Sequence, residues 1–210
     1  MLTALAAVFV VFLILVFAEY LSRYKGVHSE LTRKLVHIMV GIFVAFWPFF
    51  LSWRQIQLLS VMFVIVVAIS IRLNIFRSIH AVSRNALGEL LFGLIVGILA
   101  LIVDSEWIFA AAMLHLSLAD GLAAIVGLLY GEGNTYKVLG HTKSMAGSIA
   151  FFFTSVMIMV AYAIFSDASY GAMTLIGLPI MATIAENFSI KGTDNLVIPM
   201  LVALVLTSAI

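Results

Sequence analysis

The chain of 210 residues contains no cysteine and few charged side chains, which make up 10% of it. Without cysteine there are no disulfides, no thiolate metal sites and no cysteine nucleophile. The sequence is 64% hydrophobic, with a mean hydropathy of +1.22. No soluble domain of this length could hide so much apolar surface in its core. The composition therefore predicts an all-α, polytopic membrane protein with one membrane domain over residues 1–210.

Eight apolar runs are long enough to cross a bilayer as helices, which takes about 20 residues. They are Leu2–Ala18, Leu35–Trp53, Ile56–Ile71, Leu87–Val103, Trp107–Tyr130, Ala146–Phe165, Tyr170–Ala185 and Asn195–Ile210. The first run has neither a basic flank before it nor a small-residue cleavage site after it. We therefore expect a retained span rather than a signal peptide.

Positive charge is distributed unevenly between these runs. Ten of the 11 lysines and arginines fall in alternate loops, within residues 19–34, 72–86, 131–145 and 186–194. The loops on the other side contain only Arg54. Because cytoplasmic loops carry the excess of Lys and Arg, we expect these four loops in the cytoplasm and both termini outside.

Asp120 is the only carboxylate that lies well inside an apolar run. A charge at membrane depth is costly, so its presence indicates a function. Ala123, Ala124, Gly127 and Gly131 follow it at helical spacing and share its face. Such a stripe of small residues lets another helix, or a nucleotide, approach the backbone closely.

A possible phosphate site follows a glycine-rich polar loop, where the sixth run begins. Lys143 and Ser144 directly precede that run, and Gly147 and Ser148 lie in its first turn. Ser144 is a suitable N-cap. An ammonium, a hydroxyl and free backbone amides would then converge, as phosphate binding requires.

Other carboxylates lie at the ends of the runs. Glu89 begins the fourth run, where it either complements the helix dipole or serves catalysis. Glu186 ends the seventh run and faces the negative end of the dipole, so we expect a compensating cation, either Lys191 or a bound metal. Asp194 and Asn195 open the eighth run, where N-capping is the alternative to a functional role for Asp194.

One further basic cluster and a single histidine have simple structural explanations. Arg33, Lys34 and His37 begin the second run, and a basic flank of this kind often extends toward the headgroups. His115 points to a different helix face from Asp120, so we expect it to be packed and hydrogen-bonded.

Taken together, however, the motifs place carboxylates suited to Mg²⁺ and cations suited to phosphate beside apolar helices. This combination indicates phosphoryl transfer involving a membrane lipid.

These motifs resemble those of the CTP-dependent polyprenol and phytol kinase family, which also includes dolichol kinase and a CTP-dependent diacylglycerol kinase. The matching pieces are RKLVH (Arg33 to His37), GE (Gly88, Glu89), DGLAAIVGLLYG (Asp120 to Gly131), KSMAGS (Lys143 to Ser148) and, after Glu186, GTDNLVIP (Gly192 to Pro199). One departure is Glu132, where the family pattern has a basic residue. Its phosphate contact would then come from Lys137 or His141.

The resemblance implies phosphorylation of a lipid alcohol of polyprenol, dolichol or phytol type by CTP, with a divalent cation such as Mg²⁺, at the cytoplasmic side of the membrane. It implies no nucleic-acid partner. The implied catalytic residues are Asp120, Lys143, Glu89 and Glu186, and the implied metal ligands are Asp120 and Asp194. The implied nucleotide-binding residues are Arg33, Lys34, His37, Gly127, Gly131, Lys137, Ser144, Gly147, Ser148 and Asn195.

Two other functions are compatible with parts of the pattern. A cytidylyltransferase would use CTP and a lipid phosphate to make a CDP-lipid, and it would release pyrophosphate rather than CDP. A membrane transporter would use Asp120 as an ion or proton site, but it predicts an inverted repeat that the sequence does not show.

Overall fold

The structure, a computed structural model, describes residues 2–25, 29–73, 85–166, 171–189 and 192–208. Nearly all of these residues are helical, so the all-α prediction is confirmed apart from one small hairpin. The helices before the middle of the chain are α1 (Leu2–Lys25), α2 (Ser29–Ala45), α3 (Trp53–Leu73), α4 (Asn85–Ile102) and α5 (Glu106–Leu114). The later ones are α6 (Asp120–Tyr130), α7 (Met145–Phe165), α8 (Ala172–Phe188) and α9 (Asp194–Ser208).

Each of the eight apolar runs corresponds to a helix or a continuous pair of helices. Among the described residues, three are long and apolar enough to cross a membrane, namely Leu31–Phe49, Glu106–Tyr130 and Met145–Phe165. Shorter apolar stretches of 10–17 residues lie within α1, α3, α4, α8 and α9. The chain is therefore a membrane protein, while the number of helices that cross and the side that each loop faces stay predictions.

The second apolar run was predicted to be one helix over Leu35–Trp53, and this boundary is wrong. Helix α2 ends at Ala45, and the chain then makes a single 3-10 turn over Trp47–Phe49. Pro48 lies in this turn. Proline has no backbone N–H and its ring collides with the preceding turn of a helix, so the α-helix ends before it.

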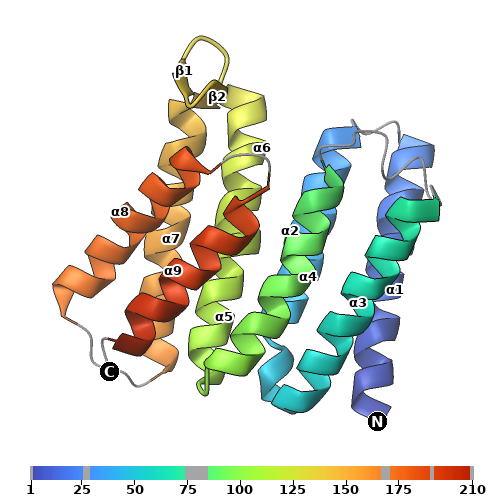
Figure 1. The fold of residues 1–210 in the computed structure, drawn as a ribbon. Helices are drawn as coiled ribbons and strands as arrows, with labels where there is room; N and C mark the ends of the chain where they lie inside the picture. The colour runs from blue at the N-terminus through green and yellow to red at the C-terminus, as the bar shows by residue number, and fades with distance from the viewer. Residues whose placement is uncertain (1, 26–28, 74–84, 167–170, 190–191, 209–210) are drawn as a thin grey trace.

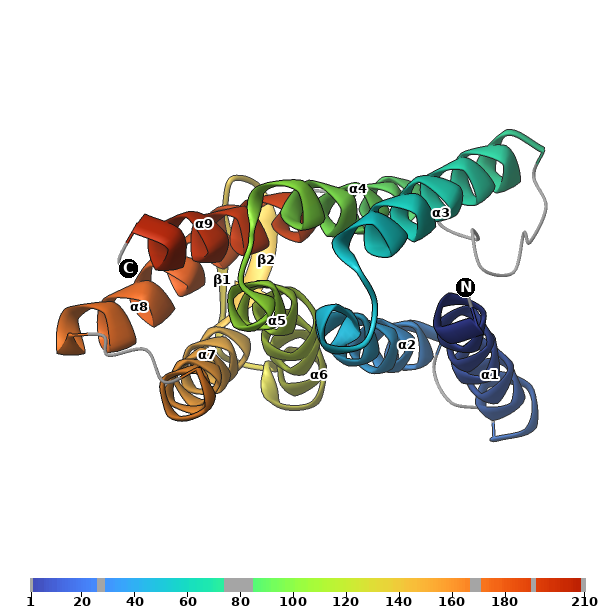
Figure 2. The same cartoon turned by 90° about the horizontal axis from the view of Figure 1, so that it is seen from below.

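The fifth apolar run forms the centre of the bundle (Figures 1 and 2). Helices α5 and α6 are joined without a break by a π-helical turn over His115–Ala119. Phe109, Ala112 and Met113 on α5 are fully buried in the main hydrophobic core. The π-helical turn ends directly before Asp120, and such turns are frequent at functional sites.

The stripe of small residues on α6 packs against α7. A Cβ at Gly147 would lie 2.9 Å from the carbonyl oxygen of Ala123, and one at Gly127 would lie 3.0 Å from the Ser144 hydroxyl oxygen. A Cβ at Gly131 would lie 2.8 Å from the Ser144 Cβ. Of the two expected partners for this stripe, the structure therefore shows another helix.

The polar loop between α6 and α7 contains a β-hairpin that the sequence analysis did not predict. Strands β1 (Thr135–Val138) and β2 (His141–Ser144) pair antiparallel, with Tyr136 directly opposite Lys143. The turn between them has φ of 47° at Leu139 and 80° at Gly140. Two positive φ values in succession are typical of the tight turns that match the twist of a hairpin.

The hairpin marks one end of the bundle. In Figure 1 it lies at the top, while the two termini and the connections that precede α3 and α5 lie at the bottom. Because the helices alternate in direction, α2, α4, α7 and α9 all begin toward the hairpin end. Their positive dipole ends therefore gather on the same side of the molecule.

Candidate active site

Asp120 forms a buried ion pair with Lys34. The Nζ atom of Lys34 donates to Oδ2 of Asp120 at 2.9 Å, and the two side chains are only 14% and 8% exposed. The pair joins α2 to α6, which approach closely because a Cβ at Gly121 would lie 2.2 Å from Ile38. The carboxylate inside the apolar run is thus compensated by a lysine from a helix 86 positions away in sequence.

Glu186 forms the second ion pair, with Lys143 of β2. The Lys143 Nζ lies 2.5 Å from Oε1 of Glu186 and donates to its backbone carbonyl at 3.0 Å. A cation does compensate Glu186, as expected, but it is Lys143, which the expectation did not name, because the hairpin brings Lys143 over the carboxyl end of α8. Lys191 lies outside the described residues. A lysine at this end also interacts favourably with the helix dipole.

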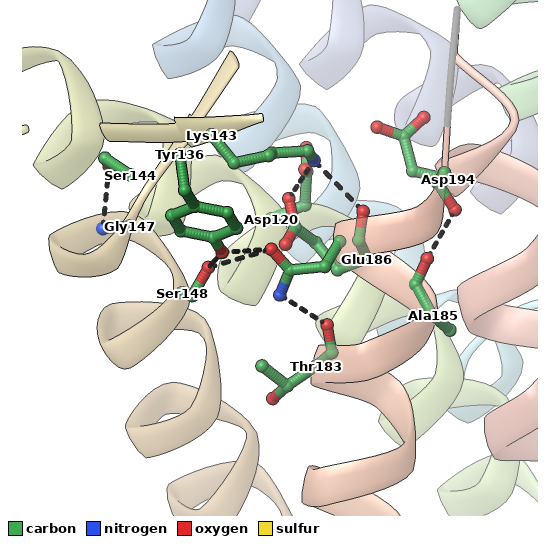
Figure 3. Close-up of polar contacts among 12 residues, drawn as sticks. Asp120, Tyr136, Lys143, Ser144, Gly147, Ser148, Thr183, Ala185, Glu186 and Asp194 are labelled. Atoms are coloured by element: carbon green, nitrogen blue, oxygen red, sulfur yellow. Dashed lines mark hydrogen bonds and ion pairs between the residues drawn. The ribbon is translucent and has the colours of Figure 1, made fainter. Parts of the chain in front are cut away.

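The two ion pairs belong to one group of charges. Asp120 interacts electrostatically with Lys143 as well as Lys34, and Glu186 interacts with Lys34 and Asp120. Asp194, at the start of α9, interacts with Asp120 and with both lysines. Figure 3 shows Asp120, Lys143, Glu186 and Asp194 gathered in the same region. We call these five residues the charged cluster.

Three polar side chains beside the charged cluster form a second group, which we call the polar triad. The Tyr136 hydroxyl lies 2.6 Å from Oγ of Ser148 and donates to Oδ1 of Asn187 (Figure 3). The Ser148 hydroxyl donates to the same Asn187 oxygen at 3.1 Å, and the Asn187 amide donates to the Thr183 carbonyl at 2.9 Å.

The sequence analysis missed two members of this triad, Tyr136 and Asn187. One available signal was the spacing of Thr183 and Asn187, polar residues one turn apart on a largely apolar helix. The other available signal was the position of Tyr136 next to Lys137. In a strand, alternate side chains share a face, so Tyr136 projects to the face opposite Lys137.

Two local predictions are confirmed. The Ser144 hydroxyl accepts a hydrogen bond from the Gly147 backbone N–H at 3.1 Å, which makes Ser144 the N-cap of α7. His115 is fully buried, and its Nδ1 is paired with the Ala111 carbonyl at 2.8 Å. His37, by contrast, pairs through Nε2 with the Leu116 carbonyl at 3.1 Å and is thus held against the π-helical turn.

At the start of α9, Asn195 and Asp194 bond to nearby backbone. The Asn195 side-chain amide donates to the Gly88 carbonyl at 2.7 Å and so joins α9 to the beginning of α4. Oδ1 of Asp194 accepts from the Asn195 N–H at 2.9 Å, a different bond from the expected N-cap. Helix α4 begins at Asn85, so Glu89, which is half-buried, lies beyond its first turn. The expected interaction of Glu89 with the positive end of the helix dipole was therefore wrong.

The remaining predicted residues lie around the charged cluster. Lys137 is exposed and alternates with Tyr136, so it projects from the opposite face of the hairpin. Arg33 is half-buried and interacts electrostatically with Lys34. Gly127 and Gly131 are close to Ser144, as described above. Direct nucleotide contacts by these residues stay predictions.

The carboxylates of the charged cluster are suited to only one kind of metal site. Within the part of the chain that the structure describes, no group of three or more His, Cys, Asp or Glu side chains could hold a metal ion. Mg²⁺ in phosphoryl-transfer sites is usually held by one or two carboxylates together with substrate phosphates and water. Asp120 and Asp194 supply two carboxylates of this kind to the charged cluster, and metal binding by them stays a prediction.

The sequence is similar to two curated phytol kinases. It is 34% identical to the phytol kinase of Synechocystis sp. over 199 residues, which cover 90% of this chain and 83% of that protein. The chain belongs to the phytol kinase family. Phytol kinase 1, chloroplastic, of Arabidopsis thaliana is 27% identical over 206 residues, which cover 87% of this chain and 67% of the plant protein. No family model matches the chain, and no solved structure matches it. Membership in the phytol kinase family confirms the resemblance that the motifs indicated.

Proposed function

We propose that this protein transfers the γ-phosphoryl group of CTP to a lipid alcohol of the phytol or polyprenol type, forming a lipid monophosphate and CDP. The observation that carries the proposal is the charged cluster, which holds two half-buried lysines, each paired with a buried carboxylate, at one end of an apolar bundle. Membership in the phytol kinase family supports a lipid alcohol as the acceptor.

The lysines and the helix ends are suited to a polyphosphate. The Lys143 ammonium has three donors. Within the described residues, Glu186 uses two of them, which leaves one for a phosphate oxygen. The amino end of α7, capped by Ser144, adds backbone amides and the positive end of a dipole. Lys34, Ser144 and Lys143 are therefore the proposed phosphate-binding residues, together with Arg33 and the other nucleotide-binding residues given above.

Asp120 and Asp194 are the proposed ligands of a divalent cation. Lys34 binds Oδ2 of Asp120, and the carboxylate has a second oxygen for a cation. When bound, Mg²⁺ would neutralise charge on the phosphates and on the phosphoryl group in transfer. Glu186 and Glu89 remain the other candidates for a proton acceptor near the reacting alcohol.

We also propose that the chain crosses the membrane several times, with the hairpin end in the cytoplasm. Ten of the 11 lysines and arginines lie in the loops assigned to that side. CTP would then approach the charged cluster from the cytoplasm, while the lipid alcohol would come from the bilayer.

A product analysis tests this proposal. Purified protein in lipid nanodiscs would be given phytol, a polyprenol, a dolichol or diacylglycerol, each with CTP labelled in the base or in the γ-phosphate. We expect label from the γ-phosphate in the lipid and label from the base in CDP. A parallel reaction would contain the corresponding lipid phosphate in place of the alcohol, and formation of a CDP-lipid with pyrophosphate there would establish a cytidylyltransferase instead. Equal rates with ATP would refute the CTP dependence, and the absence of turnover with every alcohol would refute the kinase assignment.

A further inference from the structure

A surface groove lies between α7 and α8, directly beside the polar triad. Its volume is about 280 Å³, and its walls are almost entirely apolar. The apolar walls are made by Met145, Ile149, Phe152 and Phe153 of α7 and by Ile180 and Ile184 of α8. The groove also has two polar lining residues, Ser148 and Thr183. Ser148 is at the same time a member of the polar triad, so the groove and the triad share a side chain.

We infer that this groove binds the lipid alcohol, with the hydrocarbon chain between α7 and α8 and the hydroxyl at the polar triad. The inference rests on the proposed function, because it names the place where the acceptor of that reaction binds. It also gives Ser148 a different role from the phosphate contact that the sequence analysis predicted.

The walls of the groove suit a hydrocarbon chain that arrives from the bilayer. Ile149, Phe153 and Ile184 are 53%, 61% and 52% exposed, so the groove opens to the outer surface of the bundle. A lipid chain can enter it sideways without passing through water. An apolar chain on apolar walls leaves no polar group of the wall buried without a partner.

The polar end of the groove is where a hydroxyl would be recognised. Ser148 and Tyr136 offer hydroxyls and Asn187 an amide oxygen, and a substrate hydroxyl can donate to or accept from such groups. This end also adjoins the charged cluster. Asn187 follows Glu186 in the last turn of α8, and Tyr136 is paired with Lys143 across the hairpin. An alcohol bound at the triad would therefore lie next to the lysine proposed to bind CTP.

The size of the groove predicts which part of the substrate is recognised. Its volume of about 280 Å³ is at the lower end of ligand pockets, which have roughly 300–1,000 Å³. The groove therefore holds the part of the chain nearest the hydroxyl, and the rest extends into the bilayer. We expect kcat/KM to change less than about threefold between alcohols that differ only in length, and tenfold or more when bulk is added beside the hydroxyl.

Two isoleucines on α8 provide a matched pair of variants. Ile184 lines the groove, whereas Ile176 is equally exposed, at 54% against 52%, and does not line it. Ile184→Phe should raise the KM for the lipid alcohol about tenfold or more, because the larger ring fills the groove, and should leave the KM for CTP unchanged. Ile176→Phe should change neither value.

Ser148→Ala should lower kcat/KM for the alcohol about 3- to 10-fold, as expected for the loss of one neutral hydrogen bond.

A direct binding measurement separates this inference from the proposed reaction. A phytol analogue with a photoreactive diazirine near the hydroxyl would be cross-linked to the full-length protein in nanodiscs, and the labelled residues would be located by mass spectrometry. We expect label on α7 and α8 at the groove, reduced by free phytol but not by its methyl ether, and reduced in Ile184→Phe. This result would support the groove even if no nucleotide supported turnover.

The opposite outcomes overturn the inference without affecting the proposed reaction. Label spread over all outward faces of the helices would show only general lipid contact. An active enzyme whose KM for the alcohol is the same in Ile184→Phe and in Ile176→Phe would show that the acceptor binds elsewhere.

Discussion

Tyr136 and Lys143 lie opposite each other in the β1–β2 hairpin, and they bind consecutive residues of α8, Asn187 and Glu186. Residues that are directly opposite in an antiparallel pair project from the same face. The hairpin therefore holds the carboxyl end of α8 with one neutral contact and one ionic contact. In the proposed reaction, the neutral contact lies on the side of the lipid alcohol and the ionic one on the side of CTP.

Replacement of Lys143 by methionine tests the nucleotide side. If Lys143 contacts the CTP phosphates, the loss of one charge-assisted hydrogen bond removes about 1.5–3 kcal/mol. We expect kcat/KM for CTP to fall roughly 10- to 100-fold, with little change in the KM for the lipid alcohol. Separate titrations of CTP and lipid measure the two values. Arg54→Met is the control, because Arg54 is exposed on α3 and belongs to no proposed site.

The same substitution also leaves the buried Glu186 without its partner, which destabilises a protein by about 3–5 kcal/mol. The double variant Lys143→Met/Glu186→Gln, compared with Glu186→Gln alone because Glu186 is itself a proposed catalytic residue, separates this effect from catalysis. We expect it to regain thermal stability relative to the single variant while its activity with CTP stays low. Recovery of CTP turnover together with stability would limit Lys143 to a structural role.

Asp120→Asn tests the metal and phosphoryl side of the charged cluster. Asparagine keeps the shape of the side chain but not the charge, so we expect activity to fall by about three orders of magnitude, a loss of several kcal/mol of transition-state stabilisation. The variant should still insert into membranes. Asp104→Asn, an exposed position in the connection between α4 and α5, is the control. If Asp120→Asn still shows substantial turnover, the ion pair with Lys34 is the only role left for Asp120.

The parts of the site that were predictable from sequence are those that local physics determines. A carboxylate inside an apolar run identified Asp120, and a hydroxyl before a helix identified Ser144 as a cap. The partner of Asp120 was not predictable, because Lys34 is 86 positions away and resembles an ordinary basic flank. The contact between Tyr136 and Asn187 joins residues 51 positions apart through a hairpin. Its turn contains Leu139 at positive φ, which is rare for a bulky residue and gives no sequence signal.

The orientation in the membrane can be tested because the natural chain has no cysteine. Single-cysteine variants Lys137→Cys, Arg54→Cys and Asp104→Cys would be labelled in intact cells with a membrane-impermeant maleimide. All three positions are exposed in the structure. Position 137 should be labelled only after the cells are opened, whereas positions 54 and 104 should react from outside. Labelling of positions 137 and 104 from the same side would contradict the proposed topology.

Two glycines provide a test of the α6–α7 packing that supports the charged cluster. A Cβ at Gly147 would lie 2.9 Å from the Ala123 backbone oxygen and 3.0 Å from the Ser144 hydroxyl oxygen, so α7 must shift away from α6 to accept alanine. We expect Gly147→Ala to lower the free energy of unfolding by about 1–3 kcal/mol, as overpacking does. Gly177→Ala on α8 is the control, because among the described residues no atom lies within 4 Å of its added Cβ. It should be neutral or stabilise the helix by up to about 1 kcal/mol. Thermal unfolding in detergent would compare the two variants, and CTP titration of Gly147→Ala should show a raised KM because the shift moves the capped end of α7. Equal stability of the two variants would show that the close approach of α6 and α7 is not required for the fold.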